Sequence, residues 1–374
     1  MYGLASTTMI VYFLRDWTAI LKYGAKVLLF FELCKYNLHK CKKNITFAHK
    51  LDWRTMTNKE RYHELCQNTP SLPLFMMDWW MDAVCAGKEW DVLLNVDENG
   101  EIQAALPYLL RKRAWMRYIV MPQQTQIGGI WICEKAKEDN GKVAEICQNF
   151  ANQLESLGLS YYYQHYPIDS PAAEQMQAMG FKTKERVTYR IEDLSDLDKV
   201  IGAFSKNKKR QLQKALSLHA DTSMGVEDFY RFHTQCLQEQ GKQISYSREF
   251  LLVLERKAAR LKQSQILSIC NADNEVLAAA FLVWDTHSMY YLIPCYKPQY
   301  KDTGAGALLV LEAIKLARQQ GVAFDFEGSM IRGVANHYKQ FGSKRTLYYS
   351  VERYYKWYFW FANAWNWLRE RKMR

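Results

Sequence analysis

Two acidic residues in the segment 322–327 (VAFDFE) have a spacing that suits proton transfer. Apolar and other residues alternate in this segment, which predicts a strand that ends at Glu327. Asp325 and Glu327 then lie on the same face of the strand, and two neighbouring carboxyl groups raise the pKa of one of them. Glu327 is therefore the candidate general base, with Asp325 as its partner. The alternative is that both residues form ion pairs with cations such as Arg332 or Lys339.

A pair of glycines before a predicted helix marks a second candidate site. Gly304 and Gly306 lie where the apolar helical pattern of residues 308–317 begins, and Thr303 is available as a cap. The first amides of a helix are unpaired and lie at the positive end of its dipole, so a phosphate or pyrophosphate can bind there. Lys301 adds a cation beside this turn. The alternative is that the glycines only permit a tight turn and close packing.

Other polar residues are candidates for substrate contact. Tyr338 or Tyr296 can donate a proton, although the chain contains 24 tyrosines. Ser329 can cap the following segment or donate to a substrate. A run of cations without an acid comprises Lys206, Lys208, Lys209, Arg210 and Lys214. This run can be a solvated helix face, a grip on an anionic substrate, or a contact with tRNA.

Length and charge indicate two globular domains with basic ends. The chain has 374 residues, which fits two domains. The formal net charge is +11, but residues 1–50 carry +6 and residues 356–374 carry +4, so the body between them is nearly neutral. This distribution argues against a broad nucleic-acid footprint on the body. The nine cysteines include no CxxC pair and no Cys/His ligand spacing, so we expect no metal site and a reducing cytoplasm.

The two ends differ in composition from the body. Residues 1–50 contain apolar patches interrupted by charges, and they can form an amphipathic surface helix, a weak membrane anchor or an extension foreign to the fold. We favour the last of these. Residues 354–374 hold nine aromatic residues followed by a basic end, which predicts a helix too short to span a bilayer. This helix can dock on the protein, lie in a membrane interface or form a dimer contact, and we favour docking.

The body shows the same order of elements twice: a strand hairpin, a strand, a helix, a strand, a short helix and a last strand. The stretch ANQLESLGLSYYYQHY (151–166) aligns with AIKLARQQGVAFDFEG (313–328). We infer a tandem repeat of one α/β unit, with domains at 51–195 and 196–353, each a central mixed sheet flanked by helices. Chance similarity of two α/β halves is the alternative.

This arrangement resembles the GNAT acyltransferase fold, and its duplication looks like the Fem-type branch of peptidyl aminoacyl-transferases and acyl-CoA-dependent relatives. The residues that carry the resemblance are FSKNKKRQLQKA (204–215), YKDTGAGALL (300–309), FDFEGSM (324–330) and HYKQFGSKRTLYY (337–349). The usual family spacing has Gln or Arg three residues before the first glycine, and this chain has Lys301 there.

The resemblance implies acyl-CoA as co-substrate, with acetyl-CoA as the expected donor and its pyrophosphate on the helix start of the second half. The residues placed at the cofactor are Lys301, Thr303, Gly304, Ala305, Gly306 and Lys339. The residues placed at the substrate are Tyr296, Ser329 and Arg210, and those at the reaction centre are Glu327, Asp325 and Tyr338. The first half has no glycine pair at its helix start, so we expect it to bind no cofactor.

We therefore expect a bacterial N-acyltransferase that moves an acyl group from acyl-CoA to an amine of a small molecule or a cell-envelope precursor. The amine must lose a proton, which is the role given to Glu327. The alternatives are a Fem-type aminoacyl-transferase that uses charged tRNA and a non-catalytic binding protein. The expected location is the cytoplasm, with the inner membrane face as a further contact through the C-terminal helix.

Overall fold

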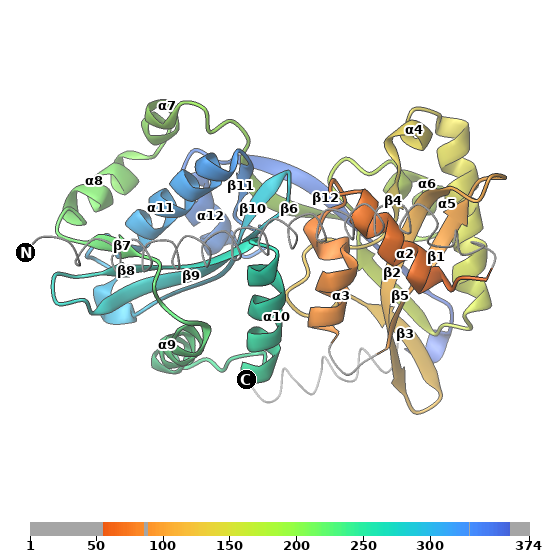
Figure 1. Ribbon diagram of the computed structural model, residues 1–374, viewed down its shortest axis with the longest axis horizontal. Helices are drawn as coiled ribbons and strands as arrows, with labels where there is room; N and C mark the ends of the chain where they lie inside the picture. The colour runs from red at the N-terminus through yellow and green to blue at the C-terminus, as the bar shows by residue number, and fades with distance from the viewer. Residues whose placement is uncertain (1–54, 86–88, 329, 360–374) are drawn as a thin grey trace, which may run out of the picture. The chain divides into compact units, whose positions relative to one another are not determined.

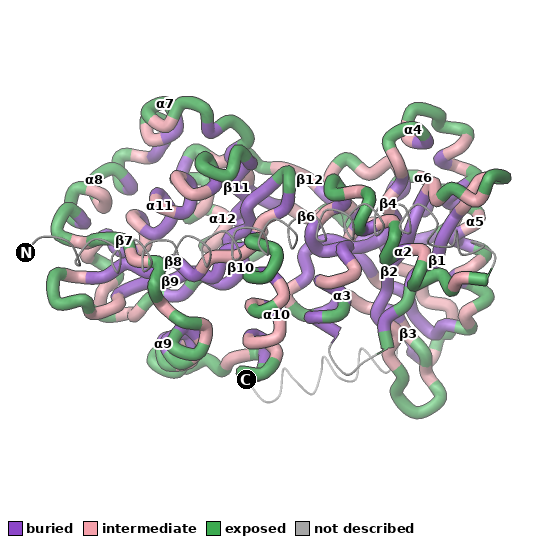
Figure 2. The backbone as a smooth tube through the Cα atoms, viewed as in Figure 1, coloured by how far each residue is buried: buried purple, intermediate pink, exposed green. Residues whose placement is uncertain are grey.

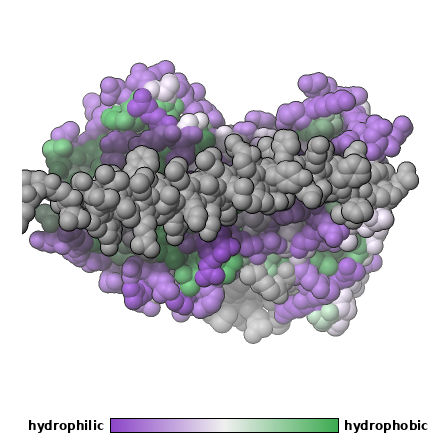
Figure 3. Space-filling view, in the orientation of Figure 1, coloured by the Kyte–Doolittle hydropathy of each residue, from purple (hydrophilic) through white to green (hydrophobic). Residues whose placement is uncertain are grey.

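The computed structural model describes residues 55–85, 89–328 and 330–359. The chain divides into two units, 1–56 and 57–374, and only the second is considered below. The predicted N-terminal extension, Ser329 and the C-terminal segment after Phe359 lie outside the described residues. Within the described ranges no helix is long and apolar enough to cross a bilayer. The coloured residues in Figure 3 are mainly hydrophilic, with smaller apolar areas between them.

The first sequence half forms the predicted order of elements. The elements are α2 (Asn58–Asn68), a 3₁₀ turn η1 (Leu74–Met76), α3 (Asp78–Val84), β1 (Trp90–Val96), β2 (Ile102–Arg113), β3 (Met116–Val120), β4 (Trp131–Ile132), α4 (Glu134–Lys137), α5 (Asn140–Ser156), β5 (Tyr161–His165), α6 (Ala172–Ala178) and β6 (Lys182–Ile191). Side chains cap the helices as the sequence requires. Thr57 and Glu60 form a reciprocal capping box before α2, and Asp139 accepts from two amides at the start of α5.

The second half repeats this order after an insertion of helices. The elements are α7 (Leu197–Gly202), α8 (Lys206–Lys214), β7 (His219–Asp221), α9 (Val226–Glu239), α10 (Arg248–Arg260), β8 (Ser264–Cys270), β9 (Val276–Trp284), β10 (Ser288–Tyr296), η2 (Pro298–Tyr300), α11 (Ala305–Gln320), β11 (Ala323–Asp325), α12 (Arg332–Lys339) and β12 (Lys344–Tyr354). β3 runs parallel to β5 and β10 runs parallel to β11, so the two halves match in pairing as well as in order. The predicted α/β repeat with mixed sheets is confirmed.

The two halves exchange their last strands. The strands form one sheet in the order β1-β2-β3-β5-β12-β6-β11-β10-β9-β8-β7 (Figure 1). β12 from the second half lies beside β5 of the first, and β6 from the first half lies beside β11 of the second. β6 and β12 pair with each other along nine residues of each strand. Each spatial half of the sheet is therefore completed by a strand from the other half of the sequence.

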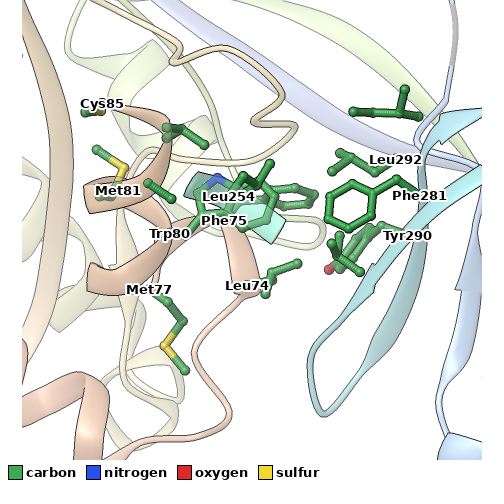
Figure 4. Close-up of a cluster of buried hydrophobic side chains, with 14 of the residues drawn as sticks. Leu74, Phe75, Met77, Trp80, Met81, Cys85, Leu254, Phe281, Tyr290 and Leu292 are labelled. Carbon is green, nitrogen blue, oxygen red and sulfur yellow. The ribbon is translucent and has the colours of Figure 1, made fainter. Parts of the chain in front are cut away.

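Apolar side chains fill three buried clusters. Figure 2 shows the buried parts of the backbone in purple and the exposed loops in green. One cluster lies under α5, one lies under α11, and a third joins the two sequence halves. In the third cluster Phe75 contacts Trp80 and Tyr290 edge-on, with ring centroids 5.0 and 4.6 Å apart (Figure 4). Such aromatic pairs stabilise a packed core by about 1 kcal/mol each beyond the area they bury.

One predicted element is shorter than expected. The strand predicted to end at Glu327 ends at Asp325, because Glu327 and Gly328 both adopt left-handed backbone angles, with φ of 59° and 60°. A Cβ on Gly328 would lie 2.0 Å from the carbonyl oxygen of Val187, so only glycine permits the turn to approach β6 this closely. The second predicted carboxylate therefore lies on a turn and not on the strand.

Candidate active site

The strands β10 and β11 separate and leave an opening at the start of α11. They pair only from Ser288 to Tyr290 and from Ala323 to Asp325. Beyond this point β10 has no partner in β11 and pairs with β9 on its other side, with a register shift between Tyr290 and Ile293. A pocket of about 560 Å³ lies at this opening, between the free part of β10, the first turn of α11, and parts of α8 and α12. This volume is in the range of small-molecule sites.

The two glycines of the α11 start have different structural roles. Gly304 is the N-cap residue with φ of 88°, and a Cβ there would lie 2.1 Å from the carbonyl oxygen of Gln211 in α8. Gly304 is therefore required for a left-handed cap and close helix packing, which is the structural alternative stated for it above. A Cβ on Gly306 would meet no atom within 4 Å. The absence of a side chain at Gly306 therefore leaves open space in the pocket wall.

The first turn of α11 presents unpaired donors to the pocket. Residues 304–307 line it, and the amides of Gly304 and Gly306 have no backbone acceptor among the described residues. The Thr303 hydroxyl accepts from the Ala305 amide at 3.3 Å and donates to the Tyr300 carbonyl at 2.7 Å. Thr303 thus orders the turn rather than facing the pocket. Free amides at the positive end of a 16-residue helix attract an anion.

Three lysines line the same pocket, and no described residue of its wall is acidic. Lys242 and Lys301 are exposed, whereas Lys208 on α8 is 3% exposed. The Lys208 ammonium donates to the side chain of Gln211 at 3.1 Å and lies 3.2 Å from Nδ1 of His337. Burial lowers the pKa of Lys208 to about 8. Burial and then the Lys208 charge lower the pKa of His337 to about 4, so the imidazole is neutral and accepts from Lys208.

The two predicted carboxylates interact electrostatically with Tyr338 and are absent from the described pocket wall. Asp325 accepts from the Thr188 hydroxyl at 2.5 Å and from the Glu327 amide at 2.7 Å, and its second oxygen lies 3.6 Å from Nε of Arg190. Burial raises the pKa of Asp325 to about 6, against the opposite effects of Thr188 and Arg190. Asp325 therefore forms an ion pair, as the alternative prediction states, but its partner is Arg190 and not Arg332 or Lys339.

Glu327 is the most perturbed acid of this group. Burial, and then the charge of Asp325, raise the pKa of Glu327 well above its ordinary value. Its Oε1 atom is shielded from solvent and has no hydrogen-bond partner among the described residues. Its φ of 59° is uncommon for a residue with a side chain and represents about 1–3 kcal/mol of local strain. A half-buried carboxyl group with one shielded, unpartnered oxygen on a strained backbone is typical of a functional position.

Tyr338 connects the carboxylates with the pocket. Its ring stacks on Phe326, with centroids 4.6 Å apart, and the residue lines the pocket from α12. Burial raises the pKa of Tyr338 to about 12, and the charges of Glu327 and Asp325 add to the rise. The hydroxyl is therefore protonated at neutral pH and lies within electrostatic reach of both acids.

Of the remaining predicted residues, one lines the pocket, two do not, and one lies outside the described residues. Tyr296 lines the pocket and is 49% exposed. Lys339 lies over the ring of Tyr189 at 5.9 Å and is absent from the described pocket wall. Arg210 is exposed and donates to the side chain of Asn207 at 3.2 Å, also away from that wall. Ser329 lies outside the described residues.

Sequence reasoning overlooked Lys208, Gln211 and His337 as pocket residues. In the sequence Lys208 stands out only as one cation of a run, yet Lys208 lies four residues after Phe204 and four before Leu212, which contribute to the core under α11. This spacing places Lys208 on the buried face of α8, and it was a signal available in the sequence. The described residues contain no cluster of acidic, His or Cys side chains suited to a metal.

Comparisons with known proteins agree with this geometry. The sequence model of the acetyltransferase (GNAT) domain family matches residues 202–340. No curated protein sequence matches the chain. The crystal structure of FemX is similar with a TM-score of 0.60 at 13% identity, over 79% of this chain and 96% of FemX. A conserved protein of unknown function from Bacteroides thetaiotaomicron has a TM-score of 0.50 at 9% identity, over 73% of this chain and 88% of that one. Residues 202–340 therefore match the GNAT domain family, and the described chain has the GNAT/Fem-type acyltransferase fold.

Proposed function

We propose that the second sequence half transfers an acyl group, in the simplest case acetyl, from acyl-CoA to an amine of a small molecule or a cell-envelope precursor. The observation that carries this proposal is the pocket at the start of α11, which combines open amides at Gly306 with three lysines and no acid in its described wall. This charge pattern fits a donor that carries several phosphates.

The pocket suggests how the donor is oriented. The pyrophosphate lies on the first turn of α11, where Gly306 allows close approach to the backbone, and Lys301 neutralises it from the solvent side. Lys208 supplies a charged donor inside the pocket, where water competes little for it. The acyl group then points along the free part of β10 towards Tyr338.

The carboxylates and Tyr338 supply the proton transfers. The amine nitrogen attacks the thioester carbonyl, the C–N bond forms and the C–S bond breaks. Glu327 accepts the proton of the amine, and Tyr338 protonates the departing thiolate. Glu327 then returns a proton to Tyr338, so the products are an amide and free CoA. Burial, and then the charge of Asp325, raise the pKa of Glu327, which makes this carboxyl group a stronger base for the exchange.

Two measurements test the proposal. Calorimetric titration of the full chain with CoA and acetyl-CoA is expected to give saturable binding, and Glu327→Gln is expected to keep this binding while it loses turnover by a factor of about 10²–10⁴. Absence of CoA binding would remove the assignment of the donor. Unchanged turnover in Glu327→Gln would remove the assigned base.

The FemX-like fold supports a second candidate, an aminoacyl-transferase that uses charged tRNA. The exposed cations of α8 fit such a partner, because Lys206, Lys209 and Arg210 face solvent. Thermal stabilisation by aminoacyl-tRNA with none by acetyl-CoA would favour this candidate. Binding of CoA with no transfer to any amine would favour the third possibility, a non-catalytic binding protein that retains the scaffold.

A further inference from the structure

The hairpin of β2 and β3 ends in an exposed basic and aromatic tip, which is formed by residues 111–117 (RKRAWMR). The last paired residues are Arg113 and Met116, so Ala114 and Trp115 form a two-residue turn, and Ala114 has φ of 52°. This is the tight turn that fits the twist of a hairpin. Trp115 is 79% exposed at the extreme end of the hairpin, which appears as the green loop below β3 in Figure 2.

The cations of this tip lie close to one another. Lys112 and Arg117 are direct cross-strand partners, although like charges in this position destabilise a sheet. Arg111 and Arg113 lie on the same strand, and Arg113, Lys112 and Arg117 are exposed. Within the described residues, the printed ion pair of the tip joins Lys112 to Glu89 at 3.3 Å. The four cations of residues 111–117, a segment without an acid, leave a local excess of positive charge on a body that is nearly neutral as a whole.

A second exposed tryptophan lies beside the same hairpin. Phe359 is buried against Tyr118 of β3, with ring centroids 5.2 Å apart, and two residues earlier Trp357 is 75% exposed. The chain is held there by hydrogen bonds, because the Lys356 amide donates to the Ser160 carbonyl at 3.3 Å. The Ser160 amide in turn donates to the Arg117 carbonyl at 2.7 Å. Both exposed tryptophans of the described residues thus belong to one end of the sheet, together with exposed Lys356.

We propose that this end of the protein, residues 111–117 with Lys356 and Trp357, docks on an anionic lipid surface. Tryptophan rings prefer the boundary between lipid headgroups and acyl chains, and arginine and lysine beside them meet the lipid phosphates. A projecting hairpin tip can enter this layer without changing the fold. The proposal goes beyond the transfer reaction and does not depend on the identity of the donor.

The shape of the tip favours a lipid surface over a nucleic acid. Proteins that bind single strands use a basic groove with aromatic platforms, and duplex binders place an element in a groove of the duplex. Here the aromatic residue with the greatest exposure is the most projecting one, and the cations lie behind it on the strands. This order matches the depth profile of a bilayer interface, where the ring enters first and the charges stop at the phosphates.

The test is co-sedimentation of the full chain with vesicles. One set of vesicles contains phosphatidylcholine alone, and the other contains equal parts of phosphatidylcholine and phosphatidylglycerol. We expect binding to the anionic vesicles that weakens as salt is raised, and little binding to the neutral ones. Lys112→Gln/Arg113→Gln is expected to lower the partition coefficient about thirty-fold, since each cation near an anionic leaflet contributes about 1 kcal/mol.

Trp115→Ala is expected to lower the partition coefficient about tenfold, and Trp115→Phe to retain most of it, because an aromatic ring remains at the tip. The matched control is Arg260→Gln/Leu261→Ala at the end of α10, which removes one cation and a leucine that is 50% exposed elsewhere on the surface. Equal binding of the tip variants and the wild type would overturn the proposal and assign binding to another segment. Loss of tRNA binding with unchanged vesicle binding in the same variants would overturn it in favour of a nucleic acid.

Discussion

Replacing Lys208 by methionine separates the stability of the fold from its affinity for an anion. Lys208 is 3% exposed, and its partners, Gln211 and His337, are both neutral. Methionine has a similar length and no charge, so the variant removes the ammonium group without opening a large cavity. We expect Lys208→Met to be more stable than the wild type at pH 7 and to bind CoA more weakly.

The pKa of Lys208 gives the size of the effect. Burial lowers this pKa from 10.5 to about 8, and at 1.36 kcal/mol per unit the difference corresponds to about 3 kcal/mol. Between pH 8 and 10.5 the unfolded chain holds the proton and the folded protein does not, so the free energy of unfolding rises with pH in this interval. Below pH 8 the folded protein carries the whole unfavourable energy of a buried charge. Loss of two hydrogen bonds offsets about 1–2 kcal/mol, so the net gain of Lys208→Met at pH 7 is about 1–2 kcal/mol.

Urea unfolding at pH 7 without ligand measures the stability, and calorimetric titration with CoA measures the affinity. Loss of a hydrogen bond to a charged group predicts a dissociation constant raised about tenfold or more. Lys206→Met is the control, because Lys206 is exposed on the same helix and both measurements should stay close to wild type. If Lys208→Met is less stable than the wild type by more than about 1 kcal/mol, or binds CoA equally well, then Lys208 is a structural residue and the reasoning is refuted.

Three further variants test the remaining parts of the site. The free energy of unfolding of Gly306→Val is expected to stay within about 1 kcal/mol of the wild type, while its affinity for CoA falls at least tenfold. Gly304→Ala should lose several kcal/mol of stability, because its new methyl group collides with α8. Equal urea midpoints for the two variants would contradict this difference. For Asp325, with its pKa raised to about 6, the unfolded chain holds fewer protons between pH 4 and 6, so stability falls by up to about 3 kcal/mol as pH rises through this range. Asp325→Asn should remove that slope, and an unchanged slope in pH-dependent unfolding would show that Asp325 is not its source.

The repeat and the element order were predictable because they depend on short-range patterns. The helix at α11 follows from its apolar spacing and from glycines at both ends, and Gly321 closes it with φ of 70° as a left-handed cap requires. The prediction of an anion site at its start rests on the same local signal. These features need only the residues within one or two turns of chain.

Other features depend on contacts between segments that are distant in the sequence, so local sequence patterns do not predict them. The end of β11 at Asp325 is set by the approach of Gly328 to Val187, which is more than a hundred residues away. The partner of Asp325 is Arg190 and not a nearby cation, because β6 is the neighbour of β11 in the sheet. The register of pairing decides both, and only the fold provides it.

The strand exchange makes the first sequence half part of the candidate reaction centre. β6 ends the first half, yet it supplies Thr188 and Arg190, which together with the Glu327 amide lower the pKa of Asp325 against the effect of burial. Without them Asp325 would stay protonated to higher pH and would contribute less negative charge to Glu327. The first sequence half lacks the glycine pair, yet its last strand contributes side chains to the candidate reaction centre. The first sequence half thus influences the protonation of the candidate reaction centre in the second.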